Sequence, residues 1–388
     1  MKIIRITPHL LRAPTGDRAF YSSQAYFAER NSCLVEIETD QGLTGWGEGG
    51  QWGPGAPVAS VLREVLAPRL IGCDPTEPVR LWEESYAFTR DFGQAGTYIE
   101  ALSAIDIACW DLAGQAVGLP VWKLLGGRFR AAVTAYATGC YYPADYADTA
   151  SMMTKLRAEV EGYAAAGFRF IKVKIGLLPL AQDVARIDMI REVLGPEVSI
   201  MVDANHAYTA GVALQMARMM APYDIRFFEE PVVPEDRAGY ARLRAASPIP
   251  IAGGECSFTR YGFRDLIAGG CVDIAQPDLA ACGGFTAIRE IVTLAQCHGA
   301  FVIPHVWGSG VAVAAALQAI ATLPPLPATA SPVALQNEPV IEFDRTHNPL
   351  RDDLVTPGFR LTDGRLPVPE RPGLGIVVDR ERLEAFRA

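Results

Sequence analysis

The sequence predicts an α/β protein in which a modified (β/α)7β barrel carries a smaller α+β capping domain. From about residue 130 onward, strand-like and helix-like segments alternate along the 388-residue chain. Asp203, Glu229 and Glu255 each end a strand-like run, at equal intervals of 26 residues (229 − 203 and 255 − 229). One strand, one helix and two loops take about that many residues in a repeating β/α chain, so the three acids fall on neighbouring parallel strands at the same end.

Length and composition narrow the class of protein. At 388 residues the chain exceeds the usual single domain, so a large barrel with a smaller domain is expected. A net charge of −9 argues against a nucleic-acid partner, and no apolar run reaches the ~18 residues of a membrane span. The N-terminus lacks a signal-peptide core and the eight cysteines form no Cys-x-x-Cys pair. We therefore expect a cytoplasmic protein without disulfide bonds or zinc ribbons.

Residues 1–125 show the mixed pattern of the capping domain. The N-terminus alternates like a strand, and a second alternating run leads through a turn into a third, which predicts a β-hairpin. Apolar residues at helical spacing predict three helices. The segments are strands at the N-terminus and over 33–39, a turn and strand over 40–48, and helices over 57–66, 79–88 and 98–117. The Pro- and Gly-rich tail, residues 345–388, is expected to return to this domain.

Residues 126–344 have the alternating rhythm of the barrel. No Gly-x-Gly-x-x-Gly loop follows a strand, so a barrel is favoured over a doubly wound sheet. The predicted strands are 133–138, 168–174, 198–203, 225–229, 249–254, 272–276, 301–304 and 339–343, with helices over 149–166, 181–193 and 211–220 between them. The connection before the eighth strand is long and rich in Pro and Ala, which weakens that assignment.

Lysine is rare in this chain, with five lysines against 30 arginines (35 − 5). Two of the five, Lys172 and Lys174, end the second barrel strand. Because side chains alternate along a strand, both lie on one face and can point into the barrel mouth. An arginine cannot be deprotonated usefully, whereas a lysine with a lowered pKa can act as a base. The pair therefore indicates a function that requires a titratable amine. The alternative is a chance pair of lysines on a solvated face.

The ends of the barrel strands together carry a complete set of groups for proton abstraction. Three carboxylates suit a hard divalent cation such as Mg²⁺, which can bind a substrate carboxylate and stabilise the enediolate formed when the adjacent C–H bond loses its proton. Lys174 is the candidate base on one face, with Lys172 lowering its pKa by like-charge repulsion. His305, after strand seven, is the candidate on the other face, with Asp278 fixing its tautomer.

These motifs resemble the mandelate racemase group of the enolase superfamily, over essentially the whole chain. The resemblance implies that Asp203, Glu229 and Glu255 are metal ligands for Mg²⁺. It implies a catalytic role for the Lys-x-Lys pair and for the dyad of Asp278 with His305. Glu342, in Val-Ile-Glu-Phe-Asp, matches a strand-eight glutamate that can hydrogen-bond the substrate carboxylate. Relatives of this kind are commonly octameric or dimeric, so a homo-oligomer is expected.

Longer runs resemble the galactarolactone cycloisomerases within that group. These runs are Asp-Ala-Asn-His-Ala-Tyr-Thr from 203, Phe-Glu-Glu-Pro-Val-Val-Pro-Glu from 228, His-Val-Trp-Gly-Ser-Gly-Val from 305, Ile-Glu-Phe-Asp-Arg-Thr-His-Asn-Pro from 341, and Pro-Gly-Leu-Gly-Ile from 372. The resemblance implies β-elimination that opens a galactaro- or glucaro-lactone to a 3-deoxy-2-keto-hexarate. A dehydratase or a racemase/epimerase acting on acyclic aldarates or aldonates is the alternative. A non-catalytic sugar-acid binding protein on the same scaffold is the alternative of another class.

Two departures from related patterns narrow the choice. Relatives with lysines on both faces, of the muconate-cycloisomerising and dipeptide-epimerising types, need a lysine near strand six, and none follows Lys174. Galactonate- and mannonate-type dehydratases resemble a pattern with a base two residues after the strand-three ligand. Asn205 stands there and cannot act as a base.

Substrate contacts are expected from two sources. At the barrel mouth the candidates are Asn205, His206 and Trp307, and in capping loops 18–27 and 49–54 they are Arg18, Tyr21 and Trp52. Rim or packing roles are the alternative for each. Strand alternation predicts that Glu230 and Cys256, each next to a proposed ligand, point away from the site and serve packing.

Overall fold

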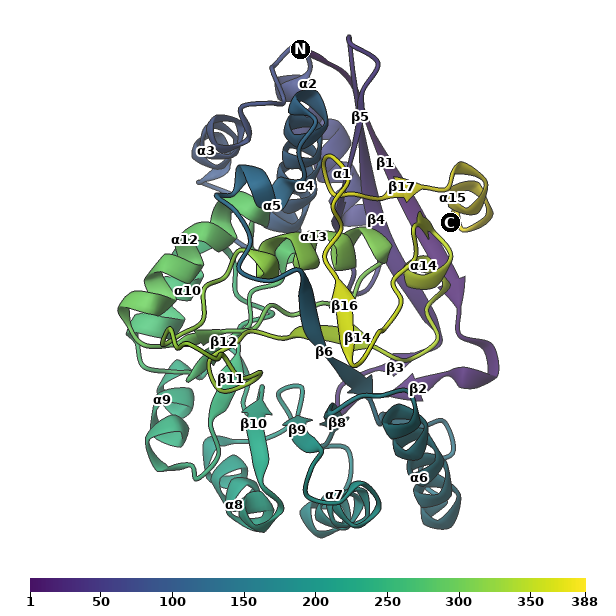
Figure 1. The fold of residues 1–388 in the computed structure, drawn as a ribbon, viewed down its shortest axis with the longest axis vertical. Helices are drawn as coiled ribbons and strands as arrows, with labels where there is room; N and C mark the ends of the chain where they lie inside the picture. The colour runs from purple at the N-terminus through teal and green to yellow at the C-terminus, as the bar shows by residue number, and fades with distance from the viewer.

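The computed structural model describes all residues, 1–388, and Figure 1 shows a capping region above a barrel. The cap is an antiparallel sheet in the order β1-β4-β5, covered by helices that include α4, the longest. The bounds are β1 Ile3–Pro14, β4 Glu29–Thr39, β5 Thr44–Gly49, α1 Ala56–Val61, η2 Leu62–Leu66, α2 Ala67–Leu70, α3 Pro78–Thr89, α4 Thr97–Val117 and α5 Val121–Leu124. The predicted hairpin and the three predicted helices are confirmed.

Glycines in β5 allow α4 to lie directly on the strand. A Cβ atom at Gly47 would come within 1.9 Å of the backbone oxygen of Ala104 in α4. No other residue type fits at this crossing, because every other side chain begins with a Cβ. The Gly-x-Gly-x-Gly pattern over 45–49 therefore serves close packing between sheet and helix.

The barrel has eight parallel strands in the order β13-β12-β11-β10-β9-β8-β6-β14. They are β6 Ala132–Gly139, β8 Phe170–Lys174, β9 Ser199–Asp203, β10 Ile225–Glu229, β11 Ile251–Gly253, β12 Ile274–Ala275, β13 Phe301–Val302 and β14 Ile341–Asp344. The intervening helices are α6 Thr149–Ala165, α7 Leu180–Leu194, α8 Ala210–Met220, α9 Arg237–Ala246, α10 Thr259–Ala268, α11 Leu279–Cys282, α12 Gly284–Cys297 and α13 Gly310–Ala321. Short 3-10 turns lie at η1 Gly16–Arg18 and η3 Ala221–Tyr223. The predicted (β/α)7β barrel is confirmed, including the eighth strand.

The interior of the barrel is filled by side chains rather than open. One buried cluster takes residues from five of the eight strands and from positions adjoining β13 and β14, as expected for a barrel whose inward-facing side chains form layers: Tyr136, Met201, Phe227, Ala252, Ile274, Ile303 and Val340. Register pairs Lys174 with Asp203 and Asp203 with Glu229 across neighbouring strands. This core closes the barrel below and leaves the polar residues of the strand ends at one level above it.

A small sheet that the sequence analysis did not anticipate joins the cap to the barrel mouth. Its strands are β2 Phe20–Tyr21, β3 Tyr26–Phe27 and β7 Tyr142–Pro143, in the order β3-β2-β7. Since β7 follows the first barrel strand, this pairing holds the capping loop 22–25 over the strand ends.

The C-terminal tail contacts both regions. Its elements are α14 Pro349–Asp352, β15 Val355–Thr356, β16 Arg365–Pro367, β17 Val377–Val378 and α15 Arg380–Ala385. Strand β16 pairs antiparallel with β6 of the barrel, and the backbone N–H of Ala388 donates to the carbonyl of Leu10 in β1 at 2.9 Å. We propose that the boundary between the capping domain and the barrel lies near residue 125. None of the helices combines the length and apolar character that a membrane crossing requires.

A charged cluster holds α15 against the cap sheet. Arg380 Nη1 donates to Glu36 Oε2 at 2.9 Å, and His9 Nε2 lies 2.9 Å from the same oxygen. Burial alone would raise the pKa of Glu36, but the hydrogen bonds from His9 and Arg380 lower it from 4.5 to about 2. The carboxylate is therefore stabilised in its ionised form.

We expect Arg380→Ala to lower the free energy of unfolding by about 1 kcal/mol, because the guanidinium is more than half exposed and water screens the pair. Since the folded pKa of Glu36 is depressed, this contribution is complete above pH 4.5 and is lost as the pH falls towards 2. Urea unfolding at several pH values measures it, with Arg382→Ala on the same helix as the matched control. A difference that does not shrink below pH 4.5 would contradict this account.

Candidate active site

Three buried carboxylates meet at the mouth of the barrel. Asp203 ends β9, Glu229 ends β10, and Glu255 follows β11. Each offers one oxygen, and these oxygens lie within 4.8 Å of one another. The parallel register of the strands produces this convergence, because equal steps along the chain bring equivalent positions to one level.

The chemistry of this set fits a hard divalent cation. Burial and the charges of Asp203, Glu342 and Glu255 raise the pKa of Glu229 to about 8, although Lys172 opposes them. The contact of Glu255 with His305 Nε2 is long, at 3.4 Å. Negative charge is therefore in excess here, and three carboxylate oxygens are the ligands that Mg²⁺ prefers. Asp203, Glu229 and Glu255 are the residues that would hold it.

The two lysines of β8 have different surroundings. Lys172 is fully buried, and its Nζ donates to Glu229 at 2.7 Å and contacts Glu342 at 2.8 Å. Lys174 reaches the cavity wall, where its Nζ donates to Asp203 and lies 5.1 Å from the ring centroid of Tyr141. Burial and Lys172 lower the pKa of Lys174, but Asp203 outweighs them and raises it above 10.5. A cation bound to Asp203 would compete with Lys174 for this carboxylate.

His305 faces the site from the other side. Its Nδ1 lies 2.6 Å from Asp278 Oδ2, and its Nε2 points towards Glu255. Asp278 is held by the backbone N–H of Ala280 at 2.7 Å and by the amide of Gln51 from the cap. The ring of Trp52 stacks on His305, with the centroids 5.6 Å apart. These contacts fix the orientation of the imidazole ring.

Glu342 of β14 lies between Lys172 and His305, at 2.8 and 3.8 Å. Its Oε1 accepts a hydrogen bond from Thr138 at 2.5 Å, and its Oε2 accepts one from the backbone N–H of Val306 at 3.2 Å. The neighbouring Lys172 holds the pKa of Glu342 down to about 2, against the effect of burial. Glu342 is thus an ionised carboxylate at the floor of the cavity.

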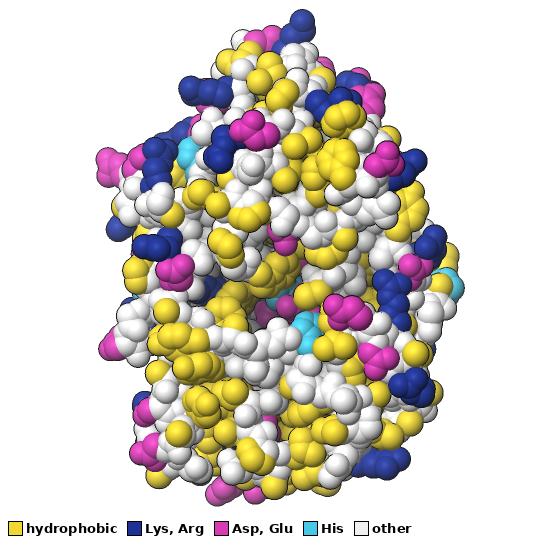
Figure 2. Space-filling model, turned by 180° about the vertical axis from the view of Figure 1, so that it is seen from behind, with side chains coloured by type: hydrophobic (Ala, Val, Ile, Leu, Met, Phe, Trp, Pro, Cys, Tyr) yellow, Lys and Arg dark blue, Asp and Glu magenta, His cyan; other side chains and the backbone are white.

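A cavity of about 280 Å³ lies between the strand ends and the capping loops. It is lined by Ser22, Gln24, Ala25, Phe27, Trp52, Glu100, Tyr141, Lys174, Asn205, His206, Glu255, Cys256, Phe258, His305, Trp307 and Glu342. We call it the central cavity. Figure 2 shows the molecule hollowed near the middle of one face, where acidic and histidine side chains lie among hydrophobic ones.

Four of the six expected substrate-contacting residues line the central cavity and two do not. Asn205, His206, Trp307 and Trp52 lie in its wall. Arg18 instead lines a neighbouring pocket of about 440 Å³, and Tyr21 packs against Tyr26 with ring centroids 4.5 Å apart. The sequence could not show this, because the pairing of β2 with β3 and β7 decides which side chains of the loop face inward.

The expectation that Cys256 points away from the site is wrong, whereas Glu230 is not among the residues that line the central cavity. The strand ends at Glu229, and Glu230 adopts a left-handed φ of 42°, which breaks the alternation. Its carboxylate lies 3.2 Å from His206 Nε2, and Cys256 lines the cavity with its Sγ 3.8 Å from the same nitrogen.

Several residues that support or line the site were not predicted from the sequence. Glu48 of β5 accepts hydrogen bonds from the backbone N–H groups of Ser309 and Ala312 at 2.8 and 2.9 Å, which ties the start of α13 to the cap. Gln276 donates to Glu229 at 2.7 Å. Glu100 of α4 reaches the cavity wall. Of these residues, only Glu48 carries a signal in the sequence. An acid within a glycine-rich strand that packs closely on a helix is buried, and a buried acid needs hydrogen-bonding partners.

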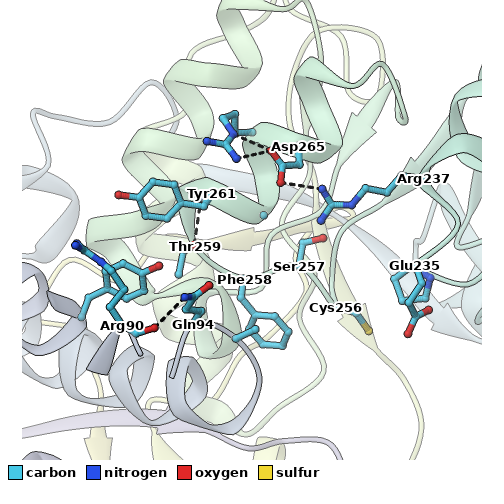
Figure 3. A pocket seen from close by; sticks show the side chains of 15 residues that line it. Arg90, Gln94, Glu235, Arg237, Cys256, Ser257, Phe258, Thr259, Tyr261 and Asp265 are labelled. Atoms are coloured by element: carbon cyan, nitrogen blue, oxygen red, sulfur yellow. Dashed lines mark hydrogen bonds and ion pairs between the residues drawn. The ribbon is translucent and has the colours of Figure 1, made fainter. Parts of the chain in front are cut away.

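A larger outer groove lies beside the central cavity (Figure 3) and shares Cys256 and Phe258 with it. Its volume is about 740 Å³. Two of its arginines, Arg237 and Arg264, are paired with Asp265 at 3.0 and 2.7 Å. None of the converging acids, lysines or dyad residues lines it, so the chemistry belongs to the central cavity.

Comparison with known proteins places this site in a family. Residues 14–126 match the "Mandelate racemase / muconate lactonizing enzyme, N-terminal domain", and residues 155–382 match "Enolase C-terminal domain-like". A D-galactarolactone cycloisomerase of Agrobacterium fabrum is 44% identical over 390 residues, covering 100% of this chain and 99% of that protein.

Two solved structures extend the comparison. The 3,6-anhydro-D-galactonate cycloisomerase from Zobellia galactanivorans superposes with a TM-score of 0.88 at 38% identity, covering 100% of both chains. A racemase from Streptomyces coelicolor with bound magnesium superposes with a TM-score of 0.87 at 30% identity, also over 100% of both chains. The chain is thus an enzyme that belongs to the mandelate racemase/muconate lactonizing enzyme group of the enolase superfamily.

Proposed function

We propose that this enzyme uses Mg²⁺ to abstract the proton α to a carboxylate of a sugar diacid, and that it opens galactaro- or glucaro-lactone by β-elimination to a 3-deoxy-2-keto-hexarate. The observation that carries the proposal is the placement of Lys174 and His305 in one cavity wall beside three converging carboxylates. The name of the Agrobacterium relative, identical at 44% of positions, supports the lactone as substrate.

Mg²⁺ held by Asp203, Glu229 and Glu255 would supply a Lewis acid for the substrate carboxylate and for the charge that develops on it. With Asp203 engaged as a metal ligand, Lys174 would lose the contact that raises its pKa, and its Nζ would receive the α proton. Lys172 and Glu342 fix the floor of the cavity around it. The lactone C–O bond at the β-carbon then breaks, the ring oxygen leaves as part of a carboxylate, and the resulting enol tautomerises to the ketone. His305 Nε2 is placed to deliver a proton on the opposite side, and Asp278 stabilises its charged form.

Dehydration of an acyclic sugar acid is the second candidate, and the position of His305 in the cavity wall supports it. The carboxylate of Asp278, 2.6 Å from His305 Nδ1, favours the protonated form of the imidazole. A protonated imidazole is the acid that a departing hydroxide requires, whereas a lactone carboxylate leaves without one.

A substrate screen separates these reactions. The purified enzyme with Mg²⁺ is incubated with aldaric acids, their 1,4-lactones and aldonic acids, and 2-keto products are measured. A keto diacid formed only from lactones supports the cycloisomerase, and product from acyclic acids supports the dehydratase. Exchange of the α proton in D₂O without a keto product would point to epimerisation. If no substrate reacts or exchanges, the proposed function is wrong. A homo-oligomer is also proposed, to be tested by light scattering.

We expect Trp52→Ala to lower kcat/KM roughly fivefold, because the stacked ring on His305 contributes about 1 kcal/mol beyond its buried area. The loss should fall on kcat as well as KM, since Trp52 both lines the cavity and orients the imidazole. Trp52→Phe keeps an aromatic face and serves as the control. Unchanged kinetics in Trp52→Ala would show that the stacking does not position His305.

A further inference from the structure

The wall of the central cavity has an uneven balance of charge. Lys174 is its only lysine or arginine, whereas Glu100, Glu255 and Glu342 all line it. Glu255 belongs to the proposed metal ligands, and Glu342 pairs with Lys172 at 2.8 Å. The third acid, Glu100, has no hydrogen-bonding or oppositely charged partner among the groups that set its pKa.

Glu100 extends into the cavity from the cap, where its backbone packs closely on β5. It lies in the first turn of α4, and a Cβ atom at Gly49 would come within 2.3 Å of its backbone oxygen. Glycine at the end of β5 therefore lets the start of α4 lie directly on the strand that leads to Gln51 and Trp52, which contact the dyad. Burial and the charge of Asp278 raise the pKa of Glu100 to about 7, as expected for an acid with no cation beside it.

We propose that Glu100 makes the central cavity selective for substrates with a single carboxylate, by accepting hydrogen bonds from sugar hydroxyls and repelling a second carboxylate. The proposal rests on the proposed function, which assigns the first carboxylate to the metal side. A lactone of a sugar diacid meets the requirement, because its second carboxyl group is esterified within the ring. The open-chain diacid does not.

The free diacid would find no lysine or arginine other than Lys174 for its second charge, and His305 already lies against Asp278 and Glu255, at 2.6 and 3.4 Å. No arginine lines this cavity, whose volume is about 280 Å³. Arg18, one of the residues expected to contact the substrate, lines the neighbouring pocket. A buried carboxylate without a cationic partner is costly, and a second carboxylate beside it adds repulsion.

Glu100→Gln tests the proposal, because it keeps the shape and removes the charge. At about pH 8, where Glu100 is ionised, galactarate is titrated as an inhibitor of lactone turnover by the Mg²⁺-loaded enzyme. We expect the inhibition constant of galactarate to fall at least about tenfold in Glu100→Gln, while KM for the lactone stays within about threefold. Glu235→Gln, which removes the same charge from the outer groove, is the matched control and should change neither value.

Two results would overturn the proposal. One is a wild-type enzyme that binds galactarate as tightly as the lactone. The other is a Glu100→Gln enzyme in which the ratio of the galactarate inhibition constant to the lactone KM equals that of the wild type. Calorimetry with galactonate and galactarate keeps the test independent of turnover. A preference for the monocarboxylate that is lost in Glu100→Gln would uphold the role of Glu100 even if no lactone were converted, in which case only the proposed reaction fails.

Discussion

Replacing Lys174 with alanine should lower kcat at least about 1000-fold, because the variant has no base on that face of the cavity. The fold should survive, since Lys174 lies at the cavity wall and the strand register does not depend on its side chain. Exchange of the α proton in D₂O, followed by NMR, is the direct measurement. Exchange should disappear together with turnover, while calorimetry should still detect substrate binding.

Lys174→Arg is the control that separates charge from basicity. Arginine keeps a cation beside Asp203 but cannot give up its proton usefully, so this variant should remain as inactive as Lys174→Ala. Lys155→Ala, which removes an exposed lysine paired with Asp145, should leave turnover unchanged. Persistent α-proton exchange in Lys174→Arg would show that another group is the base.

Replacing Glu255 with glutamine should weaken Mg²⁺ binding by at least about 100-fold and lower turnover in parallel, because one of three anionic ligands becomes neutral. Calorimetric titration with Mg²⁺ measures the affinity, and chelator-treated wild-type enzyme gives the metal-free reference. Excess Mg²⁺ should restore part of the activity if the carboxylate serves chiefly to hold the ion.

Glu235→Gln is the matched control for that experiment. Glu235 is an exposed acid of the outer groove, whereas the grouped carboxylate oxygens come from Asp203, Glu229 and Glu255. Its loss should leave Mg²⁺ affinity within about threefold of the wild type, because water and salt screen an exposed charge. Full activity of Glu255→Gln without added metal would refute the metal assignment.

The sequence by itself determined that the chain forms a barrel and that its reactive groups lie together at one end of the barrel strands. Strand and helix periodicity is local, and the 26-residue steps between Asp203, Glu229 and Glu255 follow from the length of one β/α unit (229 − 203 and 255 − 229). The parallel register then brings Lys174, Asp203 and Glu229 side by side, as that spacing requires. Local patterns were sufficient for these features, because they arise from chain repeats alone.

Only the tertiary structure decided what surrounds these groups. Glu230 leaves the strand alternation through a left-handed backbone, and Arg18, in the turn before β2, lines another pocket. Glu100 reaches the cavity because the glycines of β5 let α4 pack directly on that strand. Such contacts join residues far apart in the chain, and the alternating glycines at 45, 47 and 49 do not by themselves identify the helix that packs on them.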